Sequence, residues 1–299
     1  MLNRIVCLAA AISIFFISTC PAAQTSDANF GIICVPAANL RGTASHESEL
    51  YDQEIMGYTV KLFEKQDNWY KIQTEYGYVG WMTEKSFYRV DEAKLKQWKD
   101  CEKVRIVKVF ATIYSKPNAS SQAIAGVGMN VLLKKDKTLI GGWIKVETPD
   151  GRIGYLKKEN CVDAVKKDLS QEELRKSIIE TANLMMGTPY LWGGKSSTAN
   201  DCSGFTSTVF RANGINIGRD SSKQAVEGKA VKYKNDFSNV LPGDLIFFGN
   251  EKVSHVAISL GGKEFIHQSG SVHITSFDPN SSYYEESYGK KIKAIKRFF

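Results

Sequence analysis

The stretch Asp201-Cys202-Ser203-Gly204-Phe205 predicts the start of a helix whose first residue is a cysteine. Aspartate is a preferred N-cap, so Cys202 would occupy the first helical position. The positive end of the helix dipole favours a thiolate there, which predicts a lowered pKa for the Cys202 thiol. Phe205 and Val209 follow at i+3 and i+7, so this face is expected to pack against the rest of the domain. The alternatives for Cys202 are a disulfide partner and an inert buried thiol.

A thiol nucleophile needs a base, which is usually histidine. The chain has four histidines, of which His255 begins one predicted strand and His267 lies on the next. His46 belongs to another region of the chain. His273 follows a turn and is expected to be exposed and inert.

The loop between the two histidine strands decides whether His255 and His267 can meet. A two-residue loop, Gly261-Gly262, would place His267 opposite Val256, on the wrong face of the sheet. A three-residue loop centred on Gly261 would place His267 directly opposite His255. We predict this second register, or a bulge with the same effect. His255 would then be the base, and His267 would hold its ring in the correct tautomer.

The surrounding sequence predicts an α+β domain over residues 165–299. Ser170-Gln-Glu-Glu173 is a capping box that starts a helix, and Gly187 can close it. The helix that begins at Cys202 would end near Gly214. Helices come first and an antiparallel sheet follows. The predicted strands are Leu245 to Phe248, His255 to Leu260, Glu264 to Gln268 and Ile292 to Phe298.

Upstream of this domain, one pattern occurs twice. Trp69-Tyr-Lys-Ile-Gln-Thr-Glu-Tyr-Gly-Tyr-Val-Gly-Trp81 recurs 74 residues later as Trp143-Ile-Lys-Val-Glu-Thr-Pro-Asp-Gly-Arg-Ile-Gly-Tyr155. Each copy predicts a hairpin, with its turn at Gly77 or Gly151. More short strands, such as Thr59 to Phe63, precede it. We therefore predict two small all-β barrels, at residues 27–97 and 98–164.

The N-terminus is typical of an export signal over residues 1–23. A short basic start is followed by an apolar run from Ile5 to Ile17, which is shorter than the ~20 residues that span a membrane. Cleavage after Ala23 would release a soluble protein to the periplasm or cell envelope. A lipid anchor at Cys20 is the alternative, which Pro21 after the cysteine disfavours.

Composition excludes several other classes of protein. The chain has 39 Lys and Arg against 32 Asp and Glu, and this mild excess is spread out. That does not suggest a nucleic-acid binder. Neither C-x-x-C nor H-E-x-x-H occurs, so no zinc site is expected, and no cofactor is implied. After export, Cys34, Cys101, Cys161 and Cys202 would remain, and the sequence does not choose among their pairings.

Six motifs in one order carry a family resemblance that covers about residues 170–299. They resemble the NlpC-type cell-wall cysteine peptidases, which implies a papain-like fold for the α+β domain. The repeats resemble bacterial SH3-like domains, which end in G-x-[IV]-G-[WY]. The motifs are Pro189-Tyr-Leu-Trp-Gly-Gly194, Asp201-Cys-Ser-Gly-Phe205, Asp220-Ser-Ser-Lys-Gln224, Leu241-Pro-Gly-Asp-Leu245, Ser254-His-Val-Ala-Ile258 and Phe265-Ile-His-Gln-Ser269.

The resemblance implies catalytic and substrate-binding roles. Cys202, His255 and His267 match the nucleophile, the base and the polar third member. The residues that match substrate-facing positions are Tyr190, Trp192, Asp201, Ser203, Asp220 and Ser221 in the catalytic domain, and Tyr78 in the first repeat. Glu49 is the candidate carboxylate for the substrate amine, in competition with Glu47 and Glu54. The second repeat has Arg152 in place of Tyr78.

Two SH3-like domains before such a peptidase resemble the dipeptidyl-peptidase VI group. That group cuts murein peptides between D-glutamate and a diamino acid, lysine or diaminopimelate, when the N-terminal L-alanine is free. The expected partner is therefore a murein peptide in wall turnover or recycling, with no nucleic acid and no stable protein partner. The rivals are a thiol amidase or acyltransferase acting on another amide, and a wall-binding protein with an inactive peptidase domain.

Overall fold

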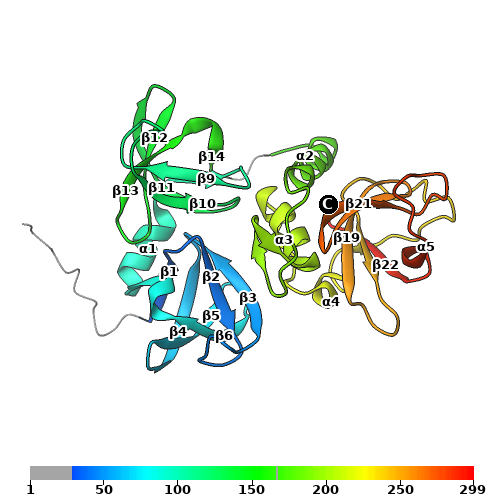
Figure 1. The fold of residues 1–299 in the computed structure, drawn as a ribbon, viewed down its shortest axis with the longest axis horizontal. Coiled ribbons are helices and arrows are strands. Elements are labelled where there is room, and N and C mark those ends of the chain that lie inside the picture. The colour runs from blue at the N-terminus through cyan, green and yellow to red at the C-terminus, as the bar shows by residue number, and fades with distance from the viewer. Residues whose placement is uncertain (1–28, 166–167) are drawn as a thin grey trace, which may run out of the picture.

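The computed structural model describes residues 29–165 and 168–299, in which two all-β units precede an α+β domain (Figure 1). The expected export signal and Cys20 lie outside the described residues. Within the described part of the chain, no helix is both long and apolar enough to cross a membrane.

The first β unit is an antiparallel sheet wrapped around its own apolar core. Its strand order is β3-β2-β6-β5-β4-β1-β7. The hairpin predicted from Trp69 onward is formed by β5 and β6, and Gly77 in its turn has a φ of +86°, which suits glycine. The strands are β1 (Phe30–Ile33), β2 (Ala37–Arg41), β3 (Leu50–Ile55), β4 (Thr59–Gln66), β5 (Trp69–Thr74), β6 (Val79–Thr83) and β7 (Phe87–Val90).

The second β unit repeats this topology strand for strand. Its order, β10-β9-β13-β12-β11-β8-β14, is that of the first unit with each strand moved seven places along the chain. Single turns of 3-10 helix at Glu84–Ser86 and Lys158–Asn160 occupy equivalent places, so the repeat extends beyond the matching hairpins. The strands are β8 (Lys103–Ile106), β9 (Ala111–Tyr114), β10 (Ala123–Val127), β11 (Leu132–Ile140), β12 (Trp143–Glu147), β13 (Ile153–Lys157) and β14 (Cys161–Asp163).

A helix that the sequence pattern did not predict, α1 (Glu92–Asp100), joins the two units. Its N-cap Asp91 accepts a hydrogen bond from the Lys94 backbone at 2.8 Å. Trp98 is buried and donates from its indole to the Gly57 carbonyl at 2.9 Å. The boundary expected between residues 97 and 98 falls within this helix, so the units are joined by a packed element and not by a free linker.

The α+β domain has the expected order of elements. The capping box at Ser170 and Glu173 starts α2 (Gln171–Leu184), and α3 (Cys202–Ala212) begins at Cys202 as predicted. The sheet order is β17-β22-β18-β19-β20-β21. The strands are β17 (Lys229–Ala230), β18 (Leu245–Phe248), β19 (His255–Gly261), β20 (Glu264–Ser269), β21 (Ser271–Ser276) and β22 (Ile292–Arg297). The prediction missed β17, β21, the short pair β15 (Lys195–Ser196) and β16 (Ala199–Asn200), and the single-turn helices α4 (Ser221–Gln224) and α5 (Glu286–Gly289).

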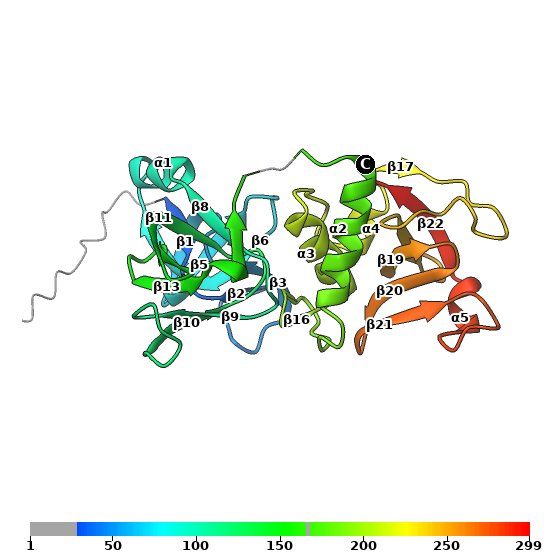
Figure 2. The same cartoon turned by 90° about the horizontal axis from the view of Figure 1, so that it is seen from above.

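The helices α2 and α3 lie between the sheet and the two β units (Figure 2). Phe205 and Val209 are fully buried in the core between helix and sheet, which confirms the packing face predicted for α3. A second apolar cluster, including Phe248 and Phe265, packs elsewhere on the same sheet. Cys202 is the first residue of this packed helix.

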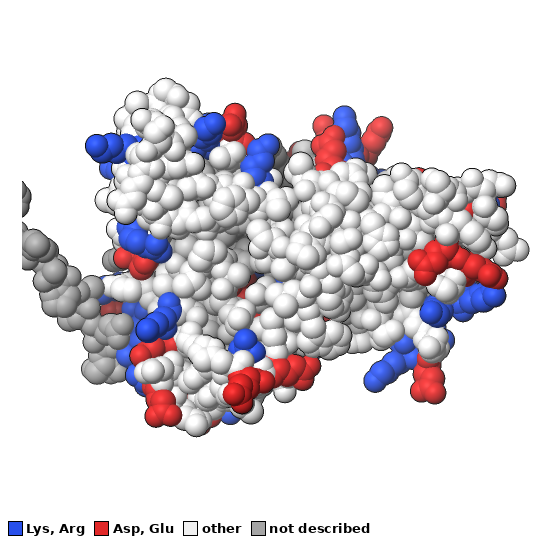
Figure 3. All heavy atoms as spheres, viewed as in Figure 1, with Lys and Arg blue, Asp and Glu red and all other residues white. Residues whose placement is uncertain are grey.

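Basic and acidic side chains are interspersed on the face drawn in Figure 3, mostly around its edges. No basic stripe crosses that face. Several of these groups form exposed ion pairs, such as Lys65 with Glu84 and Lys134 with Glu147. Exposed pairs of this kind contribute little to stability.

Candidate active site

A cavity of about 750 Å³ opens where the first β unit meets the α+β domain. Cys202 and His255 line it together, whereas His267 lies behind His255 and is fully buried. All eight residues predicted to contact the substrate line the same cavity. They are Tyr190, Trp192, Asp201, Ser203, Asp220 and Ser221 from the α+β domain, and Glu49 and Tyr78 from the first β unit.

Cys202 occupies the first position of α3, and Asp201 is the N-cap, as predicted. The Asp201 carboxylate accepts from the Gly204 backbone N–H at 2.6 Å. A side chain at position 204 would collide with the Gly194 carbonyl, since a Cβ there would lie 2.0 Å from that oxygen. Glycine at this position therefore lets the preceding loop approach the start of the helix closely.

The predicted lowering of the Cys202 pKa is wrong. Burial, and then the charge of Asp201, raises the pKa of the thiol to about 11. Hydrogen bonds from the Val256 and Ser203 backbones, together with Arg219, oppose this rise without overcoming it. The cost of desolvating the thiolate outweighs the stabilisation that the helix dipole gives it. The resting nucleophile is therefore a neutral thiol that must give its proton to a base.

The predicted register of the histidine hairpin is wrong in detail, although the two side chains share a face. A bulge between Ser259 and Gly261 places His267 opposite Ala257, two residues from His255. His255 and His267 are therefore diagonal neighbours, and Nε2 of His255 lies 2.8 Å from Nδ1 of His267. The bulge thus places both histidine side chains on one face of the sheet, as the predicted pair required.

The hydrogen bond between His255 and His267 couples the tautomers of the two rings. Nε2 of His267 lies 3.0 Å from the Thr275 hydroxyl. If His267 donates to Thr275, its Nδ1 accepts from His255 Nε2, and His255 Nδ1 is left unprotonated. The opposite direction would leave no lone pair on His255 for a thiol proton. Burial, and then His273, lowers the pKa of His255 to about 4, so the ring is neutral at pH 7.

His273 is not the exposed, inert side chain that was predicted. It lies on β21 directly opposite His267 and is half-buried, with ring centroids 4.5 Å apart. Burial, and then His255 and His273, lowers the pKa of His267 to about 2. The missed strand β21 explains the error, because it folds back beside β20. His46 lies in the first β unit, where it packs on Trp69 at 4.8 Å, and it does not line the cavity.

Two contacts cross the cavity from the first β unit to the α+β domain. The Tyr78 hydroxyl donates to the Asp220 carboxylate, 2.9 Å from both oxygens. Burial, followed by the Asp220 hydrogen bond, raises the pKa of Tyr78, so this hydroxyl stays protonated. The indole of Trp192 donates to Glu49 at 2.9 Å.

Of the three glutamates considered for the substrate amine, Glu49 alone lines the cavity. Glu54 is fully buried and pairs with Arg211 and Lys195 at 3.1 and 3.4 Å. Glu47 lies outside the residues that line the cavity.

The remaining cavity residues surround the nucleophile. Burial, and then the ionised form of Cys202, raises the pKa of Tyr190 to about 12, so its hydroxyl can donate at neutral pH. Asp201 is 8% exposed, and its oxygens already accept from Gly193, Gly204, Ser203 and Arg219. With its lone pairs engaged by the protein, Asp201 serves to orient the start of the helix.

No local sequence pattern indicated the buried charges beneath this cavity. Asp52, Lys195 and Arg219 are each at most 5% exposed, and they come from separate parts of the chain. Arg219 directly precedes the Asp220-Ser motif, which is the single hint that could have drawn attention to it.

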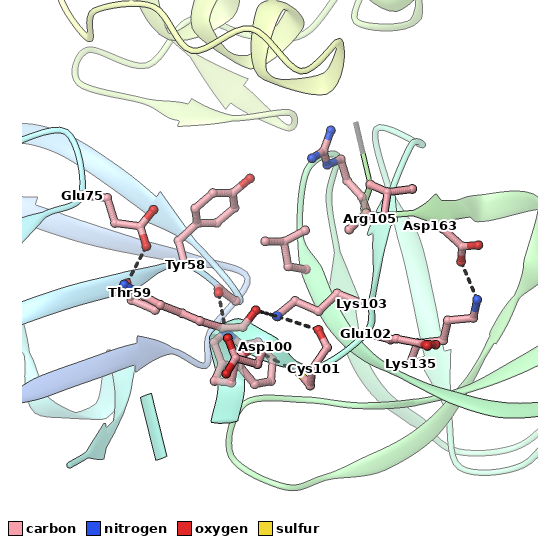
Figure 4. A pocket seen from close by; sticks show the side chains of 16 residues that line it. Tyr58, Thr59, Glu75, Asp100, Cys101, Glu102, Lys103, Arg105, Lys135 and Asp163 are labelled. Carbon is pink, nitrogen blue, oxygen red and sulfur yellow. Dashed lines mark hydrogen bonds and ion pairs between the residues drawn. The ribbon is translucent and has the colours of Figure 1, made fainter. Parts of the chain in front are cut away.

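A different hollow, of about 620 Å³, lies between the two β units and α1, and Cys202 is not among its lining residues (Figure 4). One ion pair joins two of its charged side chains, Lys135 and Asp163, at 2.7 Å. Cys101 lines it, and the four cysteines of the described residues are all free thiols. Those residues contain no cluster of three or more His, Cys, Asp or Glu arranged to hold a metal.

Comparisons with known proteins agree with this geometry. Residues 187–293 match the family model of the NlpC/P60 family. The chain carries an NlpC/P60 domain. Residues 36–87 match the bacterial SH3 domain, within the first β unit. The NlpC/P60 domain therefore follows one recognised SH3 domain and one unit of the same strand order.

Relatives extend the similarity beyond the NlpC/P60 domain. The chain is 29% identical to dipeptidyl-peptidase 6 of Lysinibacillus sphaericus, over 90% of this chain and 99% of that protein. It is also 29% identical to the γ-D-glutamyl-L-lysine dipeptidyl-peptidase of Bacillus cereus, over 82% of this chain and 75% of the relative. The crystal structure of an NlpC/P60 family protein from Bacillus cereus has the same fold, with a TM-score of 0.75 and 24% identity over 90% and 99% of the two chains.

Proposed function

We propose that this protein is a cysteine peptidase that hydrolyses the γ-D-glutamyl–diamino acid bond of murein peptides whose N-terminal L-alanine is free. One observation carries the proposal. A single cavity holds a Cys–His pair at one part of its wall and Glu49, Tyr78 and Asp220 at another. The names of the two similar dipeptidyl-peptidases support the same bond.

The chemistry starts from a neutral thiol and a neutral imidazole. His255 takes the proton of Cys202 through Nδ1, and the sulfur attacks the γ-glutamyl carbonyl. His267 accepts from His255 Nε2 and stabilises the imidazolium that forms. His255 then protonates the leaving amine of the diamino acid, and water resolves the thioester. Because the pKa of the Cys202 thiol is raised to about 11, little thiolate is expected at neutral pH before substrate binds.

The developing oxyanion needs donors that are already in position. Cys202, whose backbone N–H is at the start of α3, and Tyr190 both line the cavity and are the candidate donors. Tyr190 remains protonated because its pKa is raised to about 12. Preorganised donors of this kind are typical of acyl-transfer sites.

The first β unit supplies the specificity for a free amine. A substrate ammonium between Glu49 and Asp220 would meet two carboxylates and the Tyr78 oxygen, which orders it for attack at the γ-carbonyl. An acetylated alanine carries no charge and cannot satisfy these groups. A longer wall strand whose alanine amine is acylated would be excluded for the same reason. The substrates are therefore small murein fragments.

Two further assignments belong to the proposal. The second β unit is a second SH3-like domain. Its strand order supports this, and so does the hairpin motif of the first unit, which recurs in it 74 residues later. The chain is exported to the periplasm or envelope and released by cleavage after Ala23, as the apolar run from Ile5 to Ile17 supports.

The test measures hydrolysis of L-Ala-γ-D-Glu-L-Lys and of its diaminopimelate counterpart. Each peptide is used with a free and with an acetylated alanine, against wild type and Cys202→Ala. We expect wild type alone to cut, and only the free-amine peptides. Cleavage of acetylated peptides would show that Glu49 and Tyr78 do not select for a free amine. Absence of any cleavage by wild type would favour another amide substrate or a wall-binding protein.

A further inference from the structure

A chain of buried charges runs from the first β unit to the N-cap of the helix that carries Cys202. Asp52, on β3, is fully buried, and Arg219 of the NlpC/P60 domain is 4% exposed. Arg219 donates through Nε to the Asp52 carboxylate. The other end of the guanidinium donates to both oxygens of Asp201, at 3.0 and 2.8 Å.

Every N–H of Arg219 is engaged. Besides the two carboxylates, it donates to the Ser203 hydroxyl at 3.1 Å and to the Gly194 carbonyl at 3.2 Å. A planar guanidinium with its donors satisfied on both sides can take one orientation only. That orientation aligns the carboxylate of Asp201, which in turn caps the helix at Gly204. Asp52 therefore influences the start of the Cys202 helix from another domain.

The buried charges around Arg219 are balanced in number. Three buried or nearly buried cations, Lys195, Arg211 and Arg219, face three carboxylates, Asp52, Glu54 and Asp201. Burial acts to raise the pKa of Asp52, but Lys195 and Arg219 outweigh it and hold that pKa below its ordinary value. Asp52 is therefore ionised, and without its charge Arg219 would have Asp201 as its single anionic partner.

We propose that Asp52 is a positioning residue for the nucleophile, which acts through Arg219 on Asp201 and so on the orientation of Cys202. The role deepens the proposed function and rests on it. Asp52 does not line the cavity and cannot touch a substrate. Its loss should therefore lower kcat and leave KM almost unchanged. The first β unit would then have two separate tasks: it binds the amine and it completes the catalytic helix.

The test compares Asp52→Asn with Glu54→Gln. Glu54 is two residues along the same strand and belongs to the same charge cluster, but it pairs with Lys195 and Arg211 and not with Arg219. We expect Asp52→Asn to lower kcat about 10–100-fold with KM within about threefold, the range for a lost charged hydrogen bond. Glu54→Gln should lose similar stability and keep kcat within about threefold.

Alkylation of Cys202 by iodoacetamide, followed by mass spectrometry across pH, gives a readout that needs no substrate. Asp52→Asn should change the pH profile of this reaction, whereas Glu54→Gln should leave it as in wild type. This arm separates the two hypotheses, because a wild type that cuts no murein peptide would refute the proposed function alone. An unchanged kcat and alkylation profile in a folded Asp52→Asn protein would overturn the positioning role. Equal kcat losses in both variants would also overturn it.

A second variant covers the case in which Asp52→Asn does not fold. Arg219→Lys keeps the positive charge but cannot bond Asp52 and Asp201 through one rigid plane. We expect it to reproduce the loss of kcat with little change in KM. Wild-type kcat in Arg219→Lys would refute the proposal.

Discussion

The two β units have one strand order and one hairpin motif, yet the first alone builds part of the active-site cavity. In the first unit, β3 carries the buried carboxylates Asp52 and Glu54, and the loop before it carries Glu49. The corresponding strand of the second unit, β10, has the sequence Ala-Ile-Ala-Gly-Val and no charge. The same strand arrangement therefore contributes to the active-site cavity in one unit and not in the other. The difference lies in a few side chains on one edge of the sheet.

The matched hairpins show the same contrast. Tyr78 of the first unit reaches Asp220 across the cavity, whereas Arg152 at the equivalent position donates to the Cys34 carbonyl of the neighbouring β unit at 3.2 Å. A duplicated fold therefore preserved the backbone and changed the partners of one turn residue. The lesson is that function in such folds depends on the residues that face the next domain.

The largest expected effect concerns the buried charges between the first β unit and the α+β domain. Lys195→Met would leave Asp52 and Glu54 without a cation that lies 3.6 and 3.4 Å away. Breaking a buried charge cluster in this way should cost about 3–5 kcal/mol of unfolding free energy. Denaturant titration measures it. The control is Lys134→Met in the second unit, whose exposed pair with Glu147 should cost at most about 1 kcal/mol. Similar losses in the two variants would mean that the buried charges contribute no more to stability than the exposed pair.

Next in size is the effect of the candidate amine partner. Glu49→Gln removes the charge but keeps the oxygen that accepts from Trp192. We expect kcat/KM on the free-amine peptide to fall about 10–100-fold, since a hydrogen bond to a charged group is lost. Glu47→Gln, in the same loop but outside the cavity, should have wild-type kinetics. If both variants behave like wild type, Glu49 does not bind the amine.

A smaller effect is expected from the hairpin tyrosine. Tyr78→Phe deletes the hydroxyl that donates to Asp220 and should lower kcat/KM about tenfold. Arg152→Ala at the equivalent position of the second unit should change kcat/KM less than twofold. Steady-state kinetics on the free-amine tripeptide measures both. A loss in Arg152→Ala as large as that in Tyr78→Phe would mean that the second unit also contributes to the site.

The smallest expected effect is on the pH dependence of kcat/KM. It distinguishes residues that change the pKa of His255 from residues that bind the substrate. His255 must be neutral to act as a base, and its pKa is lowered to about 4, so kcat/KM should decline only as pH falls toward 4. His273 contributes to that lowering, so His273→Asn should raise the pH of the acid limb by a few tenths of a unit. Tyr78→Phe, in the first β unit, should leave the limb in place. An acid limb near 6.5 in wild type would contradict the neutral pair.

Local features were predictable because neighbouring residues decide them. Asp201 as N-cap, the capping box at Ser170 and the glycine turn of each hairpin depend on contacts within a few residues, and all are present. The register of His255 and His267 was predicted less well. A bulge at the hairpin end depends on what packs around it, so residue counting gave the shared face but the wrong partner.

Local sequence patterns were enough to identify the available chemistry: a cysteine at a helix start, two histidines on adjacent strands, and a duplicated hairpin. Two other properties depend on how the domains pack together. Burial reversed the expected pKa shift of Cys202, and the extent of desolvation depends on the assembled domain. Asp52 and Arg219 are far apart in the chain, so no local pattern could predict that the first β unit reaches the cap of the catalytic helix.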